Sequence, residues 1–231
     1  MNKETLRDIS YIIHLLNPQS KYAKQQLQDL YANTAKIHDY TTSTIRDDGT
    51  AEFLTTDQRS SEATKYVFTG DSIILIHEFV NKITIDNFAK NAIDIVNNAI
   101  KVLRIPIFVE QRYIIRCNAN PFGIDDSRKF IAEKVCSIKI EDLNPFARPV
   151  HGIGLRFFFP PTPEKANEFD VKIESLLKDP RCLYLECMGR YFQPVQQNNL
   201  DLIRINLLNT KQFVYDNMSN FLTQYNNKET K

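Results

Sequence analysis

The sequence contains two similar starts of a folded unit, and this repeat restricts the fold more than any other feature does. Segment 11–14 is Tyr-Ile-Ile-His, and it is followed by Asn17-Pro18 and a polar, helix-like stretch. Segment 113–116 is Tyr-Ile-Ile-Arg, and it is followed by Asn120-Pro121 and a second such stretch. A shared strand that leads through a similar turn into a similar helix indicates an internal duplication, which predicts a pseudo-symmetric fold.

Hydrophobic periodicity gives the order of elements. The clearest helix is 85–103, where apolar side chains recur at helical spacing after Thr84 as a cap. The pairs Asp48-Gly49 and Gly70-Asp71 predict tight hairpin turns. Strands are predicted at 6–16, 40–45, 50–55, 65–68, 72–80, 107–118, 152–159, 169–177, 182–192 and 200–205. Helices are predicted at 21–33 after Ser20 as a cap, at 85–103, at 125–136 and from Asn209 or Thr210 onward, and the polar tail 226–231 is expected to fray.

These elements predict an α+β fold made of two pseudo-symmetric repeats, each a strand, a helix, three or four strands and a helix. The repeats are expected at 1–105 and 106–231, with a proline-bearing insertion at about 141–163 in the second. Their strands should form a mostly antiparallel sheet, with the long helices packed on one face.

The repeated element order resembles the topology of TATA-binding-protein-like folds, in which a long helix lies across a curved sheet. We do not transfer DNA binding, because the glycine hairpin of that repeat has no match beyond residues 69–71 and a basic excess is missing. The order is also similar to duplicated strand-helix-strand-strand modules of bacterial effector-binding proteins. Segments 152–159 and 182–192 resemble a sporadically distributed, uncharacterised bacterial family of duplicated α+β proteins. That resemblance implies a fold but no activity and no catalytic residues.

Composition limits the classes of function. The 29 basic and 28 acidic side chains give a net charge of +1, whereas proteins that bind nucleic acid through its phosphates usually show a clear basic excess. No apolar run approaches the length that spans a bilayer, and the polar start lacks the apolar core of a secretory signal. The four cysteines form no Cys-x-x-Cys pair and lie in apolar stretches, so we expect buried, reduced thiols in a cytoplasmic protein, without zinc. The cysteines are Cys117, Cys136, Cys182 and Cys187.

Arginines accompanied by aromatic residues on the second-half strands form the candidate binding site. Arginine forks beside aromatic faces suit phosphate, carboxylate or nucleobase recognition. The alternative interpretation is that these arginines pair with Glu110, Glu168, Glu174 and Glu186 within the sheet. The candidate residues are Arg112, Arg116, Arg156, Phe157, Phe159, Arg190 and Tyr191, with Arg204 as a further arginine on a predicted strand.

Histidines and glutamates offer weaker candidates for chemistry. His14 and His77 are predicted to project from one sheet face, and with His151 they have the side chains to bind a metal or move a proton. Glu78 and Glu186 are expected at comparable places in the two halves, as a carboxylate pair for acid–base work or a cation. In both cases we favour the simpler interpretation of ordinary strand positions. We therefore assign no catalytic residue, no metal and no cofactor.

Segment 157–161, Phe-Phe-Phe-Pro-Pro, is the most informative feature for function. Neighbouring side chains of a strand point to opposite faces, so three consecutive phenylalanines cannot all enter one core. At least one should face a partner, a ligand or a second layer. The leading hypothesis is thus a non-enzymatic binding or assembly protein whose partner is another protein or a second copy of the chain. The alternatives are nucleic-acid binding through the arginine strands, and a small-ligand protein or enzyme with a pocket between helix and sheet, involving His77 and Glu186.

Overall fold

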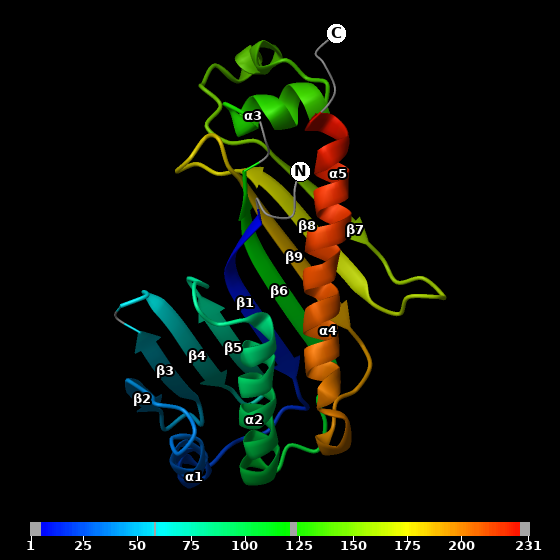
Figure 1. Ribbon diagram of the computed structural model, residues 1–231. Helices are drawn as coiled ribbons and strands as arrows, with labels where there is room; N and C mark the ends of the chain where they lie inside the picture. The colour runs from blue at the N-terminus through cyan, green and yellow to red at the C-terminus, as the bar shows by residue number, and fades with distance from the viewer. Residues whose placement is uncertain (1–5, 58, 121–123, 227–231) are drawn as a thin grey trace.

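The strands form one antiparallel sheet that runs through the whole molecule (Figure 1). The computed structural model describes residues 6–57, 59–120 and 124–226, and within these ranges the sheet has nine strands in the order β2-β3-β4-β5-β1-β6-β9-β8-β7. Pro121 and residues 227–231 of the tail lie outside the described residues. The strands are β1 (Leu6–Leu16), β2 (Thr42–Ile45), β3 (Ala51–Asp57), β4 (Glu62–Phe68), β5 (Ser72–Glu78), β6 (Glu110–Ala119), β7 (Gly154–Phe159), β8 (Glu168–Ser175) and β9 (Leu183–Tyr191).

The centre of the sheet is the antiparallel pair β1–β6, in which Ile12 lies opposite Ile114. On one side β5 pairs with β1, and on the other β9 pairs with β6. The strands of segments 1–105 and 106–231 therefore join in one continuous sheet. The chain has a mixed α+β fold, as predicted.

The longest helix, α2, has the predicted bounds. Its cap Thr84 accepts a hydrogen bond from the backbone N–H of Asn87, and it ends where Arg104 adopts a left-handed conformation. Helix α1 begins later than predicted, with Ala23 rather than Ser20 at the cap. The helices are α1 (Lys24–Thr34), α2 (Ile85–Leu103), α3 (Ser127–Lys129), α4 (Asp201–Gln212) and α5 (Ser219–Asn226), with π-helical segments at Phe130–Val135 and Phe213–Met218 and 3₁₀ turns at Ile140–Phe146 and Gln197–Asn199.

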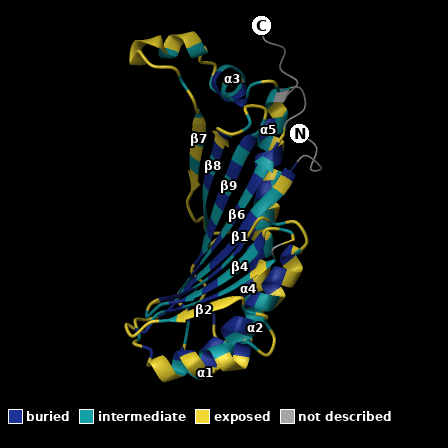
Figure 2. Cartoon of the chain, turned by 90° about the vertical axis from the view of Figure 1, so that its left-hand side faces the viewer, coloured by how far each residue is buried: buried dark blue, intermediate teal, exposed yellow. Residues whose placement is uncertain are grey.

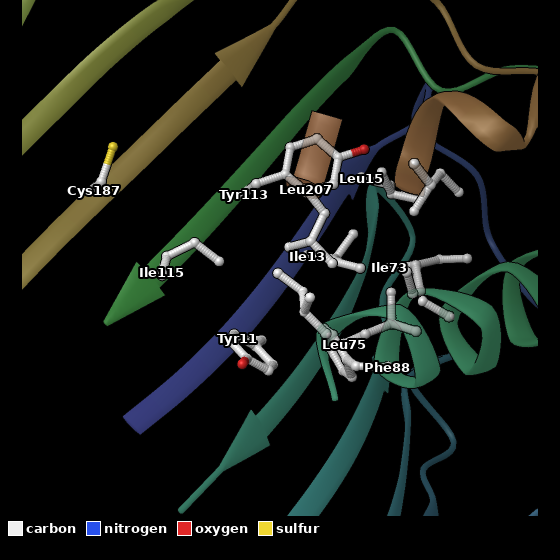
Figure 3. Close-up of a cluster of buried hydrophobic side chains, with 14 of the residues drawn as sticks. Tyr11, Ile13, Leu15, Ile73, Leu75, Phe88, Tyr113, Ile115, Cys187 and Leu207 are labelled. Carbon is white, nitrogen blue, oxygen red and sulfur yellow. The ribbon is translucent and has the colours of Figure 1, made fainter. Parts of the chain in front are cut away.

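The two faces of the sheet differ in what they contact. We call the face that carries Tyr11, Ile13 and Leu15 the inner face, and the opposite one the outer face. Phe88 of α2 packs on Tyr11, with ring centroids 5.8 Å apart. Figure 3 shows this core, in which side chains of β1, β5 and β6 lie around Phe88 and Leu207 of the helices, while Cys187 of β9 lies at its margin. In Figure 2 the sheet is seen nearly edge-on, and α2, α4 and α5 lie beside the inner face.

A β-bulge changes the direction of one acidic side chain in β1. Asp8 lies opposite Cys117 while Ser10 lies opposite Arg116, so Ile9 is an extra residue on β1. Strict alternation would place Asp8 on the face opposite Tyr11. The bulge instead brings the Asp8 carboxylate to the inner face, where it accepts a hydrogen bond from the Tyr11 hydroxyl.

Two predicted elements of the second half are different in the structure. Segment 200–205 was predicted as a strand, but Leu200 is the cap of α4 and residues 201–205 are its start; α4 continues through Phe213–Met218 into α5. The predicted helix 125–136 is a short α-helical turn followed by the π-helical segment Phe130–Val135. The insertion contains the exposed 3₁₀ turn Ile140–Phe146, in which Phe146 is 74% exposed, and the edge strand β7.

Candidate functional site

Three of the candidate arginines gather on the outer face, on the neighbouring strands β6 and β9. Arg112 lies directly opposite Arg190, and Arg116 lies two residues further along β6 than Ile114. Each of the three side chains is about a third exposed. The structure thus brings three of the candidate arginines together on two neighbouring strands.

Every one of these arginines is bound to a carboxylate of the same face. Glu110 Oε1 lies 2.6 Å from Nε of Arg112 and 2.6 Å from Nε of Arg190. Arg190 also donates to Glu168 at 3.0 Å, and Arg116 donates to Glu186 at 2.8 Å. Hydrogen bonds from Arg190, the largest influence, hold the pKa of Glu110 below its ordinary value even though burial opposes this. Ligand anions would have to displace these carboxylates.

Glu186 accepts hydrogen bonds from three side chains of this network. It accepts from Lys172 Nζ at 2.6 Å and from the Tyr184 hydroxyl at 2.8 Å, in addition to Arg116. Burial acts to raise the pKa of Glu186, but the hydrogen bonds from these three donors outweigh it and lower the pKa. Glu186 is thus an ionised structural partner of cations, which does not fit the role of a general acid.

Between the charged residues, the centre of the outer face is apolar. The cross-strand row through the sheet centre consists of Ile76, Ile12, Ile114 and Met188, which lie opposite one another in neighbouring strands. The same row continues to Asp170 and Phe158. Ile12 is buried, and Ile76, Ile114 and Met188 are half-buried. The outer face therefore combines half-buried apolar side chains with internally paired charges, and it carries methionine and arginine, which are enriched at protein contact surfaces.

Arg156 lies on the sheet edge and is paired like the others. Its Nε and one terminal nitrogen donate to the two carboxylate oxygens of Asp170 at 2.9 and 2.5 Å. Its side chain is 68% exposed, twice as much as that of Arg190. Arg204, predicted on a strand, instead lies on α4 and pairs with Asp86 of α2.

The aromatic candidates divide between the two faces. Tyr191 is buried on the inner face, where its hydroxyl lies 3.2 Å from that of Thr210, and it does not join the arginines. Phe157 and Phe159 also point to the inner face and contact Phe221 and Phe213 of the closing helix. Phe158 points outward and is 59% exposed, and Phe159 is 44% exposed.

An apolar pocket of about 270 Å³ lies beside this edge, between the strands β7 and β8 and the closing helix. One of the sequence-based alternatives was a pocket between helix and sheet that involves His77 and Glu186, but this pocket is lined by other residues, which are distant in the chain. Its lining includes Phe157, Phe159, Val171, Ile173, Met218 and Phe221.

The histidines do not form a site. His14 lies on the outer face opposite Ile74, whereas His77 is buried on the inner face opposite Tyr11, so the prediction that both project from one face is wrong. The reason is their parity: β1 and β5 are antiparallel, and the register sets an even residue of β1 opposite an even residue of β5. His151 is exposed. Among residues 6–57, 59–120 and 124–226, no cluster of three or more His, Cys, Asp or Glu side chains is arranged to hold a metal ion.

His77 is held neutral by its surroundings. Nδ1 lies 2.8 Å from the Thr64 hydroxyl, and Nε2 lies 3.6 Å from Glu62 Oε1. Burial, the largest influence, lowers the pKa of His77, and Glu62 opposes it only in part. The Glu62 carboxylate is itself bound by the backbone N–H groups of Asn81 and Lys82 at 2.8 and 2.6 Å. These hydrogen bonds outweigh burial and lower the pKa of Glu62 to about 2.

The free energy of unfolding should therefore fall as the pH falls from 7 to 5. A buried neutral imidazole whose folded pKa lies below the ordinary 6.5 contributes stability above pH 6.5, and this is lost as the pH falls through the folded pKa. One such group gives a slope of at most about 1.4 kcal/mol per pH unit. Urea unfolding at several pH values should show a smaller slope for His77→Gln, whereas His151→Gln, at an exposed position, should match the wild type. An unchanged slope in His77→Gln would contradict this assignment.

Glu78 and Glu186 lie in the same cross-strand row, but they are not neighbours. Glu78 lies opposite Ser10, which lies opposite Arg116, and Arg116 lies opposite Glu186. Two strands thus separate the carboxylates, and a cation, Arg116, lies between them. They do not form the carboxylate pair that acid–base chemistry requires.

The most elaborate polar cluster was missed in the sequence. The Asp8 carboxylate accepts hydrogen bonds from Tyr11, from Lys211 Nζ at 2.6 Å, from the Tyr215 hydroxyl at 2.9 Å and from the Cys117 thiol at 3.2 Å. Lys211 and Tyr215 come from α4 and the π-helical segment after it, so the cluster ties the closing helix to the sheet. The only signal in the sequence was an acidic residue at the start of an apolar strand.

Charges in the Asp8 cluster are balanced. Burial acts to raise the pKa of Asp8, but hydrogen bonds from Lys211 and Tyr11 outweigh it and lower the pKa. Burial, followed by the Asp8 charge, raises the pKa of Tyr11, Tyr215 and Cys117. At neutral pH the cluster is thus an ion pair surrounded by neutral donors. Cys117 is an inert thiol rather than a nucleophile.

No protein-family model matches the chain, and no curated protein is significantly similar to it in sequence. Within the part of the chain that the structure describes, none of the helices combines the length and the apolar character that crossing a lipid bilayer requires.

Proposed function

We propose that this chain is a non-enzymatic binding or assembly protein that contacts another protein, in the simplest case a second copy of itself. The observation that carries the proposal is the edge strand β7. It presents Phe158 and Phe159 at 59% and 44% exposure at the end of a large sheet. Exposed aromatic side chains on an uncovered sheet edge are typical of surfaces that another chain covers.

The composition of the outer face supports the same function. Its central row of aliphatic side chains, Ile76 to Met188, is bordered by arginines that already have acidic partners. A protein partner can cover such a surface without removing those ion pairs. The four cysteines are free, which is compatible with the reducing cytoplasm in which we place the protein.

We propose further that the fold arose by duplication, with the long helices of both halves on the inner face. Support comes from the sheet order, since β5, β4 and β3 follow outward from β1 as β9, β8 and β7 follow outward from β6. Support also comes from the repeated segments themselves, which pair with each other: Tyr11 lies opposite Ile115, Ile12 opposite Ile114 and Ile13 opposite Tyr113.

In that register Ile12 faces its own counterpart in the repeat, as residues on a pseudo-two-fold axis must. This arrangement is in line with the resemblance to TATA-binding-protein-like topologies and to the duplicated α+β proteins of bacteria. β2 has no counterpart in the second half. Superposition of the two halves is the test, and halves that cannot be superposed would refute duplication.

Nucleic-acid binding has less support, because phosphate groups would compete with Glu110, Glu186 and Asp170 for the arginines. It would require salt-sensitive binding of oligonucleotides that is lost in the double variant Arg156→Ala with Arg190→Ala. An enzyme or small-ligand protein is a third candidate. His77 and Glu186 do not line the apolar pocket beside β7. His77 lies on β5, which β1, β6 and β9 separate from β8, and Glu186 lies on the neighbouring strand β9 but points to the outer face.

Light scattering coupled to size exclusion tests the leading proposal. At micromolar concentration we expect twice the mass of the single chain. The same experiment with labelled single- and double-stranded oligonucleotides at low salt should show no complex. A strictly monomeric mass would contradict homodimerisation, and a salt-sensitive oligonucleotide complex would favour the nucleic-acid alternative.

A further inference from the structure

The backbone of β7 presents a defined set of hydrogen-bonding groups at the sheet edge. The Ser175 N–H donates to Ile153 O at 2.9 Å, and the Ile153 N–H donates to the Ser175 hydroxyl at 3.0 Å, so Ile153 directs its backbone groups toward β8. Pairing between β7 and β8 continues without a bulge from Gly154 to Phe159. Because alternate residues of an antiparallel strand face opposite neighbours, Gly154, Arg156 and Phe158 direct their N–H and C=O groups away from the sheet.

This edge lacks the features that usually prevent strand pairing. Segment 154–159 contains no proline, no lysine and no bulge, and its one charged residue is neutralised by Asp170. The opposite edge strand, β2, is shorter and consists of Thr-Ser-Thr-Ile. Only Pro160, directly after β7, limits how far an added strand can extend.

The sequence of β7 is also complementary to itself in one register. A two-fold axis perpendicular to the sheet keeps outer-face residues opposite outer-face residues. With the axis at Phe157, Arg156 lies opposite Phe158 of the second copy, and Leu155 lies opposite Phe159. This register makes about six interchain hydrogen bonds: two in each Arg156–Phe158 pair and one from each Gly154 N–H to Pro160.

The neighbouring registers are less favourable. An axis at Arg156 would set two arginines directly opposite each other, which is destabilising for like charges. An axis at Phe158 sets Arg156 opposite Pro160, which has no N–H, and leaves about four hydrogen bonds. The register centred on Phe157 instead places an arginine against an exposed aromatic ring.

We propose that two copies of this chain join through β7 in an antiparallel pair centred on Phe157, so that their sheets become one continuous sheet. This inference rests on the proposed assembly function and specifies its surface. On the inner face, the second β7 would lie beside the apolar pocket lined by Phe157, Phe159 and Phe221. On the outer face, it would cover Phe158.

Proline scanning of β7 tests the contact without disturbing the fold. Arg156→Pro removes an N–H that points away from the sheet, so no hydrogen bond to β8 is lost. In a dimer the substitution removes two interchain hydrogen bonds, and we expect the dimer to be weakened by about 30-fold or more. Arg156→Ala loses the same side chain but keeps the N–H, so it is the matched reference, and its dimer should be about 30-fold tighter than that of Arg156→Pro. Urea midpoints close to that of the wild type would show that both variants fold.

The register is tested by charge and by crosslinking. Phe158→Arg places arginine opposite arginine and should give a monomer, whereas Phe158→Glu places a carboxylate opposite Arg156 and should give a dimer. Under mild oxidation Phe157→Cys should form an interchain disulfide, because only the register centred on 157 brings that residue next to its copy. The wild type, oxidised in the same way, controls for the native cysteines.

The outcomes separate this inference from the proposed function. A wild-type dimer in which Arg156→Pro and Phe158→Arg have no effect would overturn the β7 contact and leave assembly in place. Efficient crosslinking of Arg156→Cys or Phe158→Cys, with none for Phe157→Cys, would overturn the register. A monomeric wild type would overturn both the β7 contact and the homodimer.

Discussion

Replacing Asp8 by alanine is expected to lower the free energy of unfolding by about 3–5 kcal/mol. Asp8 accepts hydrogen bonds from Lys211, Tyr11 and Tyr215, and it is the carboxylate that pairs with the Lys211 ammonium group. The Asp8 side chain is 10% exposed and that of Lys211 is 22% exposed. The substitution leaves a mostly buried ammonium group with no counter-charge from Asp8, and it removes three further hydrogen bonds. The large effect follows from the unpaired lysine more than from the lost attraction.

A double-mutant cycle distinguishes this explanation from simple loss of packing. Lys211→Met removes the cation, so Asp8→Asn should cost less in the Lys211→Met background than in the wild type. The matched control is the exposed pair Lys24–Asp47, at 53% and 89% exposure, where Asp47→Ala should change stability little. Urea unfolding followed by far-UV circular dichroism measures all variants. Equal effects of Asp8→Asn in both backgrounds would show that the charge pair is not the cause.

The contribution of the Asp8 carboxylate to the free energy of unfolding should also be lost at low pH. The folded pKa of Asp8 is depressed, so its contribution is present above the ordinary value of 3.8 and is lost as the pH falls through the lower folded pKa. The Asp8 carboxylate is thus ionised at neutral pH, and the Asp8 cluster is intact there. Its role is to fix the closing helix on the inner face, and with it the wall of the pocket beside β7.

The strands and α2 were predictable because their side chains repeat with the period of the element. In α2 the apolar residues recur at helical spacing between Thr84 and Leu103, and the structure has the same bounds. Helix α4 was missed at its start because two polar residues, Asn206 and Thr210, belong to its buried side. Asn206 donates to Gln111 at 3.1 Å and Thr210 to the Asn206 carbonyl at 2.8 Å. Buried polar residues break the apolar pattern on which such predictions depend.

The candidate site was only half predictable for a different reason. Alternation along β6 places Arg112 and Arg116 on one face, whereas Arg190 of β9 joins them only through the register of the two strands. Their acidic partners depend on strand register, since Arg190 of β9 pairs with Glu110 of the neighbouring strand β6 and with Glu168 of the other neighbour, β8. The Asp8 cluster depends on a single extra residue, Ile9, that reverses the direction of the side chains before it. No local sequence pattern predicts this bulge.

Phe88→Ala is expected to destabilise the fold by about 3–5 kcal/mol. The ring is 1% exposed, and it packs on Tyr11 at 5.8 Å and on His77 at 5.9 Å between ring centroids. Figure 3 shows Phe88 of α2 directed at Tyr11 and Leu75 of the central strands. Truncation would leave a cavity between α2 and the sheet that rigid strands cannot fill. Phe146→Ala, at a ring that is 74% exposed, is the control and should be nearly neutral.

The Phe88 variant should also weaken the contact of the other long helix, because both helices use Tyr11. Lys211 of α4 lies 5.4 Å from the centre of the Tyr11 ring, whereas Phe88 of α2 contacts the same ring. Combining Phe88→Ala with Lys211→Met should therefore give a coupling energy of about 0.5–3 kcal/mol, as for residues that share a partner. Strict additivity would mean that the two helices attach to the sheet independently. Coupling would mean that the side chain of Tyr11, on β1, helps to hold both helices on the sheet.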